Sequence, residues 1–403
     1  MGRRMKILVL NGGSSSFKCW FQDVPGGPRW TARADWSRNS GSADVQINRS
    51  DGPSEIRTVT ADTPSGFLGP VLEALWKGEA KAIDAPGEID VVGHRVVHGG
   101  PKYRESVLVN PEVRAAIAAQ AEFAPSHNKL QLAAMETVDR VIGTKVPQVA
   151  VFDTGFHATL QPPAYVYPGP YAWFERGIRR YGFHGISVQY STRRAAELLH
   201  VAPNSSRLIV CHLGNGASVT AVANGKSVDT SMGFTPLEGI MMGTRSGSID
   251  PSILVYLIRH EGCSADQIDE ILNRKSGLLG VSGFSGDMRE ILEAIEKGNQ
   301  RARLAYDIFA HRLTREVGAM LAVLGGVDAI VFTGGIGENC APLRADVCRQ
   351  LAFIDLKLDA AKNANPDLDQ NIAAPASAVQ VLVIRADEDW EIARECQRLK
   401  PAG

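Results

Sequence analysis

The hydrophobic pattern of the chain opens with a short apolar run that ends in small residues. Residues 7–10 are apolar, Asn11-Gly-Gly-Ser-Ser-Ser16 follows, and residues 17–21 alternate weakly, as expected of the returning strand of a hairpin. The same plan recurs at residues 207–211, which lead through His212-Leu-Gly-Asn-Gly216 into a second hairpin. The repetition predicts two halves built on one plan.

Strand and helix patterns alternate along the rest of the chain. Residues 89–100 and 327–335 each predict a buried strand that ends in glycines and delivers a loop to a site. Amphipathic helices are predicted at residues 111–123, 127–142, 187–199, 287–296 and 299–324. This alternation predicts the α/β class. Residues 37–54, rich in Ser, Gly and Asn, are expected to form a surface connection.

The length of 403 residues exceeds what one hydrophobic core usually supports, so we expect two domains. Residues 1–152 with 386–403 are expected to form the first domain, because the final helix returns to it. Residues 153–385 are expected to form the second, which holds the nucleotide site. The duplicated α/β halves suggest two domains facing across a cleft, with their hairpins as phosphate clamps.

Composition narrows the classes of partner. A net charge of −1, with 44% apolar and 22% charged residues, argues against a nucleic-acid binder or an acidic tail. The six cysteines show no CxxC pair, which fits a reducing compartment. Residues 7–10 are too short for a signal-peptide core, and no apolar run approaches membrane-spanning length. We therefore expect a cytoplasmic protein without a membrane partner.

The most informative segment for chemistry is residues 211–251, which holds seven glycines and five charged residues. Glycines let backbone N–H groups approach an anion closely, while Arg245 adds charge and a planar donor fork. This composition predicts a site for nucleotide phosphates. Two other phosphate motifs fail: Thr220 stands where a Walker loop needs glycine, and Gly335-Ile-Gly-Glu-Asn339 lacks the third glycine of a dinucleotide fingerprint.

A set of dispersed polar residues in apolar surroundings forms the candidate site. Each lies beside a glycine or just after a strand, and the set comprises Asn11, Arg95, His127, Asp153, His184, Asn215, Arg245 and Glu388. Arg95 and Arg245 are suited to carboxylate and phosphate oxygens, although an arginine at a strand end also commonly pairs with a nearby carboxylate.

The remaining candidates also have two interpretations each. His127 and His184 can donate to an anion or satisfy a buried carbonyl. Asp153 ends an apolar run, where magnesium–phosphate sites of α/β proteins often lie, or it caps the following turn. Glu388 begins a helix, where the dipole favours an acidic residue whatever its function.

Eight sequence blocks, in this order, closely resemble the acetate/propionate kinase family, which belongs to the superfamily of actin, sugar kinases and heat-shock chaperone ATPases. The resemblance covers nearly the whole chain. The blocks are Asn11-Gly-Gly-Ser-Ser-Ser16, Gly93-His-Arg-Val-Val-His-Gly-Gly100, Phe152-Asp-Thr-Gly-Phe-His157, Arg180-Tyr-Gly-Phe-His-Gly185, His212-Leu-Gly-Asn-Gly216, residues 229–251, Gly280-Val-Ser-Gly283 and Phe332-Thr-Gly-Gly-Ile-Gly-Glu-Asn339.

The resemblance implies two ribonuclease-H-like (actin-like ATPase) domains and a homodimer formed through the C-terminal domain. It implies reversible phosphoryl transfer between ATP and acetate, giving ADP and acetyl phosphate, with Mg²⁺ or Mn²⁺. A propionate kinase or a kinase of broader short-chain acids is the alternative. In such transfer a protein mainly positions reactants and stabilises charge. Because a carboxylate is already ionised at pH 7, Asp153 is better suited to metal binding and orientation than to proton removal.

Roles carried over from the family are assigned residue by residue. The catalytic residues would be Asp153, His184, Arg245 and Arg95. The acid would be bound by Arg95, Val97, His127, Phe183 and Pro236. The nucleotide would be bound by Ser14, Ser16, Lys18, His212, Leu213, Gly214, Asn215, Gly216, Asp287, Met288, Arg289, Gly335, Ile336, Gly337, Glu338 and Asn339. Asn11 and Glu388 would hold the metal.

The chain departs from the family pattern in three places. Ser126 replaces a leucine before His127, which predicts looser discrimination between acetate and propionate. Ser248 replaces an aspartate, and Arg385-Ala386 replaces Pro-Thr before the terminal acidic residues.

Two other functions fit the sequence less well. A serine hydrolase, suggested by His98-Gly99-Gly100, lacks the Gly-x-Ser-x-Gly elbow. A non-catalytic ATP-binding module of the same superfamily would not need both arginines and His184 around an acyl pocket.

Overall fold

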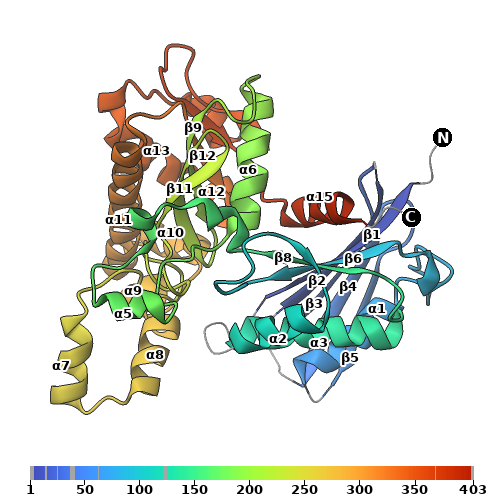
Figure 1. The fold of residues 1–403 in the computed structure, drawn as a ribbon. Helices are drawn as coiled ribbons and strands as arrows, with labels where there is room; N and C mark the ends of the chain where they lie inside the picture. The colour runs from blue at the N-terminus through green and yellow to red at the C-terminus, as the bar shows by residue number, and fades with distance from the viewer. Residues whose placement is uncertain are drawn as a thin grey trace. The chain divides into compact units, whose positions relative to one another are not determined.

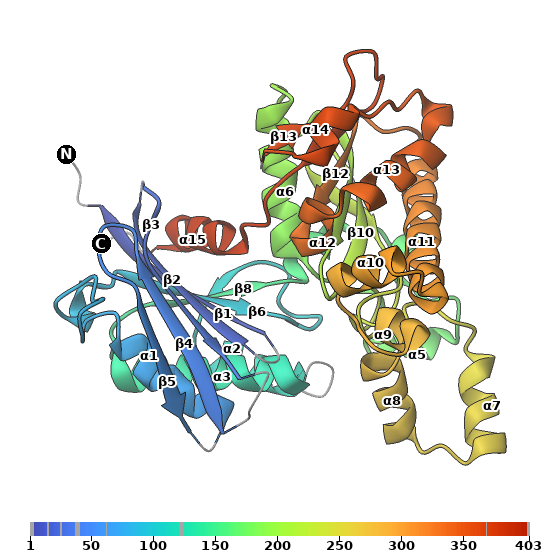
Figure 2. The ribbon, with the colours of Figure 1, turned by 180° about the vertical axis from the view of Figure 1, so that it is seen from behind.

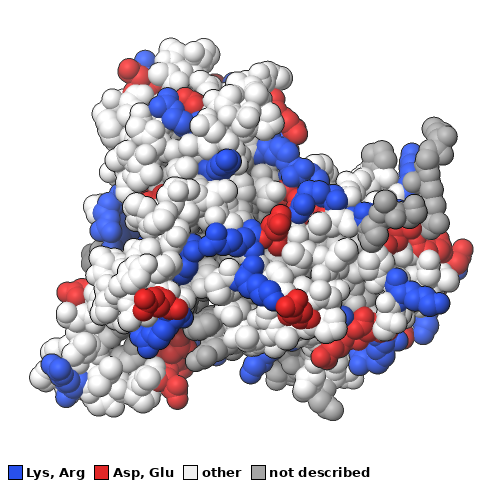
Figure 3. Space-filling model, viewed as in Figure 1, with Lys and Arg blue, Asp and Glu red and all other residues white. Residues whose placement is uncertain are grey.

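The computed structural model describes residues 4–13, 16–24, 26–36, 41–61, 63–120, 125–367 and 369–400, without the side chains of Pro28, Pro64, Pro125, Ser126 and His127. The chain forms two compact units (Figures 1 and 2). Unit 1 is Met1–Gly155 with Asp387–Gly403, and unit 2 is Phe156–Ala386. On the face shown in Figure 3, basic and acidic side chains alternate in small groups, in keeping with the near-zero net charge.

Unit 1 contains an eight-stranded sheet in the order β5-β4-β3-β2-β1-β6-β8-β7. The strands are β1 (Met5–Gly12), β2 (Ser16–Val24), β3 (Pro28–Asp35), β4 (Ser42–Arg49), β5 (Glu55–Thr60), β6 (Val91–Val96), β7 (Val107–Leu108) and β8 (Gln148–Phe152). β6 pairs in parallel with β1 and β8, and the other pairs are antiparallel. The carboxyl ends of β1, β6 and β8 therefore meet at one edge.

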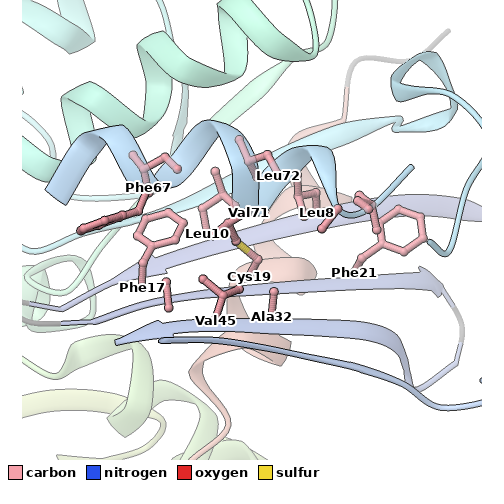
Figure 4. Close-up of a cluster of buried hydrophobic side chains, with 14 of the residues drawn as sticks. Leu8, Leu10, Phe17, Cys19, Phe21, Ala32, Val45, Phe67, Val71 and Leu72 are labelled. Carbon is pink, nitrogen blue, oxygen red and sulfur yellow. The ribbon is translucent and has the colours of Figure 1, made fainter. Parts of the chain in front are cut away.

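Helices cover both faces of this sheet. Figure 1 shows α1 (Leu68–Glu73), α2 (Pro111–Ala119) and α3 (Pro125–Val141) on one face and α15 (Glu388–Leu399) on the other. The larger core lies beneath α1, where Leu8, Leu10 and Phe17 pack against Val71 and Leu72 (Figure 4). On the opposite face a Cβ on Gly93 would overlap Ile392 and Cys396, so this glycine allows α15 to approach β6 closely.

Unit 2 contains a six-stranded sheet in the order β11-β10-β9-β12-β14-β13. Its strands are β9 (Arg207–Leu213), β10 (Ala217–Ala223), β11 (Lys226–Thr230), β12 (Ala329–Thr333), β13 (Gln370–Asn371) and β14 (Gln380–Val383). Its helices are α4 (Pro162–Tyr165), α5 (Tyr171–Glu175), α6 (Gly185–Leu198), α7 (Ser252–Glu261), α8 (Ala265–Arg274), α9 (Gly277–Ser282), α10 (Met288–Glu296), α11 (Gln300–Leu324), α12 (Gly334–Asn339), α13 (Ala341–Gln350) and α14 (Ala360–Ala364). One core packs Val188 and Ala195 of α6 against Leu208 of β9 and Val331 of β12.

The two sheets share one plan, which confirms the predicted duplication. In each, an antiparallel hairpin (β1–β2 or β9–β10) is followed by two parallel neighbours (β6 and β8, or β12 and β14). The α/β class is confirmed as well.

The predicted helices are present with shifted ends. Helices α6, α10 and α11 lie within two residues of their expected bounds, and α3 begins at Pro125, two residues before the expected start. The expectation for residues 37–54 was wrong: Ser42–Arg49 forms β4, which pairs with β3 and β5, because alternate residues Ala43, Val45 and Ile47 are buried in the core on one face of the sheet. Among the described helices, none has the length and apolar character needed to cross a membrane.

Candidate active site

Four of the expected site residues gather at the edge of the unit 1 sheet where its parallel strands end. Asn11 lies near the end of β1, Arg95 near the end of β6, Asp153 directly after β8, and Glu388 is the first residue of α15. Since β1 and β6 pair in register up to Leu10 and His94, Asn11 and Arg95 are neighbours on adjacent strands. The parallel topology thus brings together residues that are up to 377 positions apart in the sequence.

Arg95 is held in a buried ion pair with Asp153. Its Nε lies 3.2 Å from both carboxylate oxygens and its Nη2 lies 2.7 Å from Oδ2, while the Asp153 side chain is 1% exposed. Glu388 Oε2 lies 3.6 Å from Arg95 Nη1. Burial alone would lower the pKa of Arg95, but the charges of Asp153 and Glu388 raise it above its usual value. The guanidinium is therefore fixed in place and its charge is largely neutralised.

Asn11 joins this ion pair to two carboxylates at the start of α15. Its Oδ1 accepts from Arg95 Nη1 at 3.2 Å, and its Nδ2 donates to Glu388 Oε2 and Asp389 Oδ1, both at 3.1 Å. Burial, followed by the negative charge of Glu388, raises the pKa of Asp389 to about 6, although the hydrogen bond from Asn11 opposes the shift. Asp389 was not foreseen, and its only sequence signal was its place beside Glu388.

Gln131 supports the same group from α3. With its amide oriented to satisfy both partners, its nitrogen donates to Arg95 O at 3.0 Å and its oxygen accepts from Gly12 N at 3.1 Å. The fully buried amide bridges β1 and β6 beyond their last paired residues. No pattern in the sequence singled out Gln131, because a glutamine within an amphipathic helix is ordinary.

In unit 2, Arg245 and His184 converge at the turn between β9 and β10. A Cβ built on Gly216 would lie 3.3 Å from both Arg245 Nη2 and His184 Nε2, so both side chains contact this glycine. His184 adopts a left-handed conformation (φ 58°) before α6, and its Nδ1 lies 3.0 Å from Ser218 Oγ. The ring centroids of His184 and His212 are 4.2 Å apart, and His212 Nδ1 lies 2.8 Å from Ser187 Oγ.

Arg245 has no carboxylate partner among the residues that the structure describes. Its Nη1 donates to Pro236 O at 2.8 Å and contacts Met242 Sδ at 3.6 Å. Burial lowers the pKa of Arg245, and no neighbouring charge counters this effect. An arginine in such surroundings favours the arrival of an anion, because the buried cation is otherwise uncompensated.

The loop that carries Arg245 is closed by Ser248, one of the departures from the family pattern. Ser248 N donates to Gly239 O at 2.8 Å, and Ser248 Oγ accepts from Gly239 N at 3.0 Å. Gly239 has φ +112° and packs against Ser231, so a side chain there would be strained and would clash. The serine hydroxyl therefore fixes the base of this loop.

Unit 2 contains a cavity of about 750 Å³ next to the turn between β9 and β10. Its lining comes from the turn after β9, the start of α10 and the helix α12 that follows β12, and comprises Gly214, Asn215, Gly286, Asp287, Met288, Arg289, Leu292, Gly335, Ile336, Asn339 and Cys340. Because β9 and β12 are parallel, with Thr333 opposite His212, the turn and α12 both begin at one edge of the sheet. The cavity has the size and the mixed polar and apolar lining of a site for a nucleoside.

Eight of the residues expected to bind nucleotide line this cavity: Gly214, Asn215, Asp287, Met288, Arg289, Gly335, Ile336 and Asn339. Gly337 and Glu338 do not appear in its lining. Gly337 packs against β12 and β9, and Glu338 Oε1 accepts from the backbone N–H groups of Gly334 and Ala386, both at 2.9 Å. No sequence motif pointed to Gly286, Leu292 or Cys340, although Leu292 lies one helical turn after Met288.

The other expected residues are distributed over both units. Ser16, Lys18 and Val97 belong to unit 1, with Val97 buried, whereas Phe183 (buried), Pro236 and Leu213 belong to unit 2. Ser14 and the side chains of Ser126 and His127 lie outside the described residues.

Comparison with known proteins agrees with this geometry. The model of the Acetokinase family matches residues 6–394. The chain is 51% identical over 402 residues to a protein named acetate kinase from Cyanothece sp., with 98% of each chain covered. Among solved structures, it is similar to Porphyromonas gingivalis acetate kinase (TM-score 0.90, 39% identity, 98% and 99% of the chains). It is equally similar to a propionate kinase from Francisella tularensis (TM-score 0.90, 37% identity, 98% and 100% of the chains).

These solved relatives confirm the expected fold of two actin-like α/β units. A family model that covers almost the whole chain, together with relatives at about half identity, identifies the chain as a member of the Acetokinase family.

Proposed function

We propose that the protein catalyses reversible phosphoryl transfer between ATP and acetate, giving ADP and acetyl phosphate. The observation that carries this proposal is the pairing of Arg245 and His184 at Gly216, beside a cavity suited to a nucleoside. A carboxylate oxygen of acetate would form a bond to the γ-phosphorus. The bond from that phosphorus to the oxygen bridging the β-phosphate would break, and ADP would leave with the electron pair.

The residues of unit 2 would bind and stabilise the travelling phosphoryl group. Arg245, as an uncompensated cation with a planar donor fork, would bind its equatorial oxygens as charge develops on them. His184 would donate a hydrogen bond at the same place, since its Nε2 and Arg245 Nη2 approach the same glycine. The turn from His212 to Gly216 would supply backbone donors to the nucleotide phosphates.

The residues of unit 1 would orient the acid and hold the metal. The ion pair with Asp153 fixes the Arg95 guanidinium, which would bind the carboxylate of the acid. Acetate is already ionised at pH 7, so no base is required, and Asp153 would act through orientation. Val97, also in unit 1, would contact the acid, and Phe183 and Pro236 are the residues of unit 2 that would contact its methyl group.

Mg²⁺ fits the chemistry of the acidic residues at the start of α15. Glu388 and Asp389 both accept a hydrogen bond from the Asn11 amide, so two carboxylates lie close together, and burial, aided by the charge of Glu388, raises the pKa of Asp389. Mg²⁺ usually takes one or two carboxylates together with water and substrate phosphates. When bound, the ion would neutralise charge on the β- and γ-phosphates, and Asn11 and Glu388 would hold it.

The direct test is a trap for acyl phosphate. Purified protein is incubated with ATP, Mg²⁺, hydroxylamine and acetate, propionate or butyrate in turn, and the hydroxamate is measured. We expect product with acetate. A protein that binds ATP but forms no hydroxamate with any acid would be a non-catalytic module instead. Similar kcat/KM values for acetate and propionate would favour a broader short-chain acid kinase. The structural similarity to a propionate kinase is the reason to include this alternative.

We also propose a homodimer formed through unit 2 in the cytoplasm. Support comes from α7, where Ile253, Val255, Tyr256 and Ile258 are 44–57% exposed and none of its residues is buried. A helix that is apolar on several sides normally requires a partner. Light scattering should give a dimer for the wild type and a monomer for a Val255→Glu, Ile258→Glu double variant. Cell fractionation would test the location.

A further inference from the structure

A cluster of three polar side chains in unit 2 lies apart from the residues assigned above. In this cluster, called the Tyr167 cluster, Arg180 Nη2 donates to Glu238 Oε1 at 2.7 Å and the Tyr167 hydroxyl donates to Glu238 Oε2. The same hydroxyl accepts from Phe234 N at 2.8 Å. The second terminal nitrogen of Arg180 donates to three consecutive carbonyls at 3.0 Å each, those of Thr230, Ser231 and Met232.

The Tyr167 cluster joins two segments that both lead into the proposed acyl pocket. Arg180 is followed by Phe183 and His184, and Phe234 is followed by Pro236. Backbone hydrogen bonds connect the same segments, since Gly233 O accepts from Tyr181 N at 3.0 Å and from Gly182 N at 3.3 Å. The position of the Phe183 segment relative to the Pro236 segment therefore depends on this cluster.

The space around the cluster is tight. A Cβ on Gly233 would overlap both Glu238 Oε2 and the Tyr167 hydroxyl, so the backbone of the Pro236 segment lies directly against these groups. Arg180 and Glu238 are 17% and 33% exposed at their side chains, and the opposing charge and hydrogen bond of Glu238 raise the pKa of Arg180 despite its burial. A partly buried, fully hydrogen-bonded network of this kind specifies one geometry more strictly than apolar packing does.

The cluster also reaches Arg245 through the Pro236 segment. Pro236 O accepts from Arg245 Nη1 at 2.8 Å, and this is the hydrogen bond that orients the guanidinium. Movement of Phe234 after loss of the Tyr167 hydroxyl would shift a wall of the acyl pocket and this acceptor together.

We propose that Tyr167, Arg180 and Glu238 are positioning residues that set the size selectivity of the acyl pocket by fixing the Pro236 segment against the Phe183 segment. This inference rests on the proposed acyl-phosphate chemistry and adds residues that determine which acid is accepted. Intact, the cluster keeps the pocket short and favours acetate. When the cluster is disrupted, the pocket can also accept a longer acid. An apolar pocket rejects one additional methylene group only by limiting the space available to it.

The test measures kcat/KM for acetate, propionate and butyrate in four full-length proteins: the wild type, Tyr167→Phe, Glu238→Gln and Tyr306→Phe. Tyr306→Phe is the matched control, because Tyr306 also donates to a carboxylate in unit 2, that of Asp346 at 2.6 Å, yet belongs to α11. We expect the acetate-to-propionate ratio to fall about fivefold to tenfold in Tyr167→Phe, with an increased KM for acetate and an unchanged KM for ATP. Tyr306→Phe should keep the wild-type ratio.

The possible outcomes separate this inference from the proposed function. A wild type that forms no acyl phosphate with any acid would overturn both. An active wild type with ratios within about twofold of each other in all four proteins would overturn only the role of the cluster. Glu238→Gln keeps the side-chain size and removes the ion pair, so it decides the matter if Tyr167→Phe fails to fold.

Discussion

The two arginines expected to contact substrate occupy opposite electrostatic environments. In unit 1, Arg95 contacts Asp153 through two nitrogens, and Glu388 lies nearby, so its pKa is raised. In unit 2, Arg245 is oriented by a backbone carbonyl and a thioether sulfur, and burial lowers its pKa. The guanidinium of Arg95 is paired before any ligand binds, whereas that of Arg245 has no carboxylate partner among the described residues, so a ligand anion would supply its counter-charge.

This difference suggests a division of labour. A cation already paired with a carboxylate gains little by binding a second anion but holds a fixed geometry, which suits orientation of the acid. A buried cation without a partner destabilises the free protein and interacts most strongly with the species that carries the most negative charge. In phosphoryl transfer that species is the transferring group with its surrounding oxygens.

Replacement of Arg95 should give the largest combined effect. Arg95→Ala removes a substrate contact and leaves Asp153 buried without its partner, so we expect kcat/KM to fall about 10²–10³-fold and stability to fall by about 3 kcal/mol. Steady-state kinetics and thermal unfolding measure the two effects. Unchanged stability would show that the ion pair with Asp153 does not hold in solution.

Replacement of Asp153 tests the orienting side of the same pair. Asp153→Asn keeps the shape but removes the charge that holds Arg95, so kcat should fall on the order of 10²-fold, even at saturating Mg²⁺. The measurement is kcat as a function of Mg²⁺ concentration. Near-normal turnover at high Mg²⁺ would remove Asp153 from the mechanism.

Substitution of Ser126, in unit 1, should have a smaller effect, which concerns the choice of acid. Restoring the apolar residue with Ser126→Leu should raise the acetate-to-propionate ratio of kcat/KM by about threefold to tenfold. The substrate series described for the Tyr167 cluster measures it, with Ser126→Thr as a control that stays polar. An unchanged ratio would mean that residue 126 does not contact the acid.

Asp389 should give the smallest effect, seen in metal-free protein. Its pKa is raised to about 6 in the folded state, so the folded state binds more protons than the unfolded state between about pH 4 and pH 6. Stability from this group therefore falls as pH rises through that window. Asp389→Asn should have a higher Tm than the wild type at pH 8, and the difference should shrink toward pH 4. A gain that is independent of pH would contradict the assignment.

Much of the architecture could be predicted from the sequence. The two hairpins with glycine-rich turns predicted the duplicated plan, and the sequence around Arg95 and before Asp153 was correctly predicted to form strands. Only the folded sheet shows that these strands, β6 and β8, end at the same edge as β1. The main helices followed from their periodicity. Residues 42–49 were misread because the small and polar residues around them masked the alternation of Ala43, Val45 and Ile47.

The charge state of the site could not be predicted. Arg95 and Arg245 both lie near glycines, and only the folded chain brings Asp153 and Glu388 to the first while leaving the second with Pro236 O. Long-range support was also hidden, since Gln131 and Tyr167 belong to segments without a motif. All residues from Gly335 to Asn339 were expected to contact the nucleotide. In the helix, however, Glu338 points toward the backbone N–H groups of Gly334 and Ala386.

The most direct test of the account compares the thermal stability of two ligand-free variants. Methionine in place of arginine keeps much of the side-chain volume, so Arg95→Met and Arg245→Met differ mainly in whether a buried carboxylate loses its partner. We expect Arg95→Met to lower Tm by about 6 °C or more, whereas Arg245→Met should leave Tm unchanged or raise it. An equal loss of stability in both variants would show that Arg245 is already compensated and would contradict the proposed division between the two arginines.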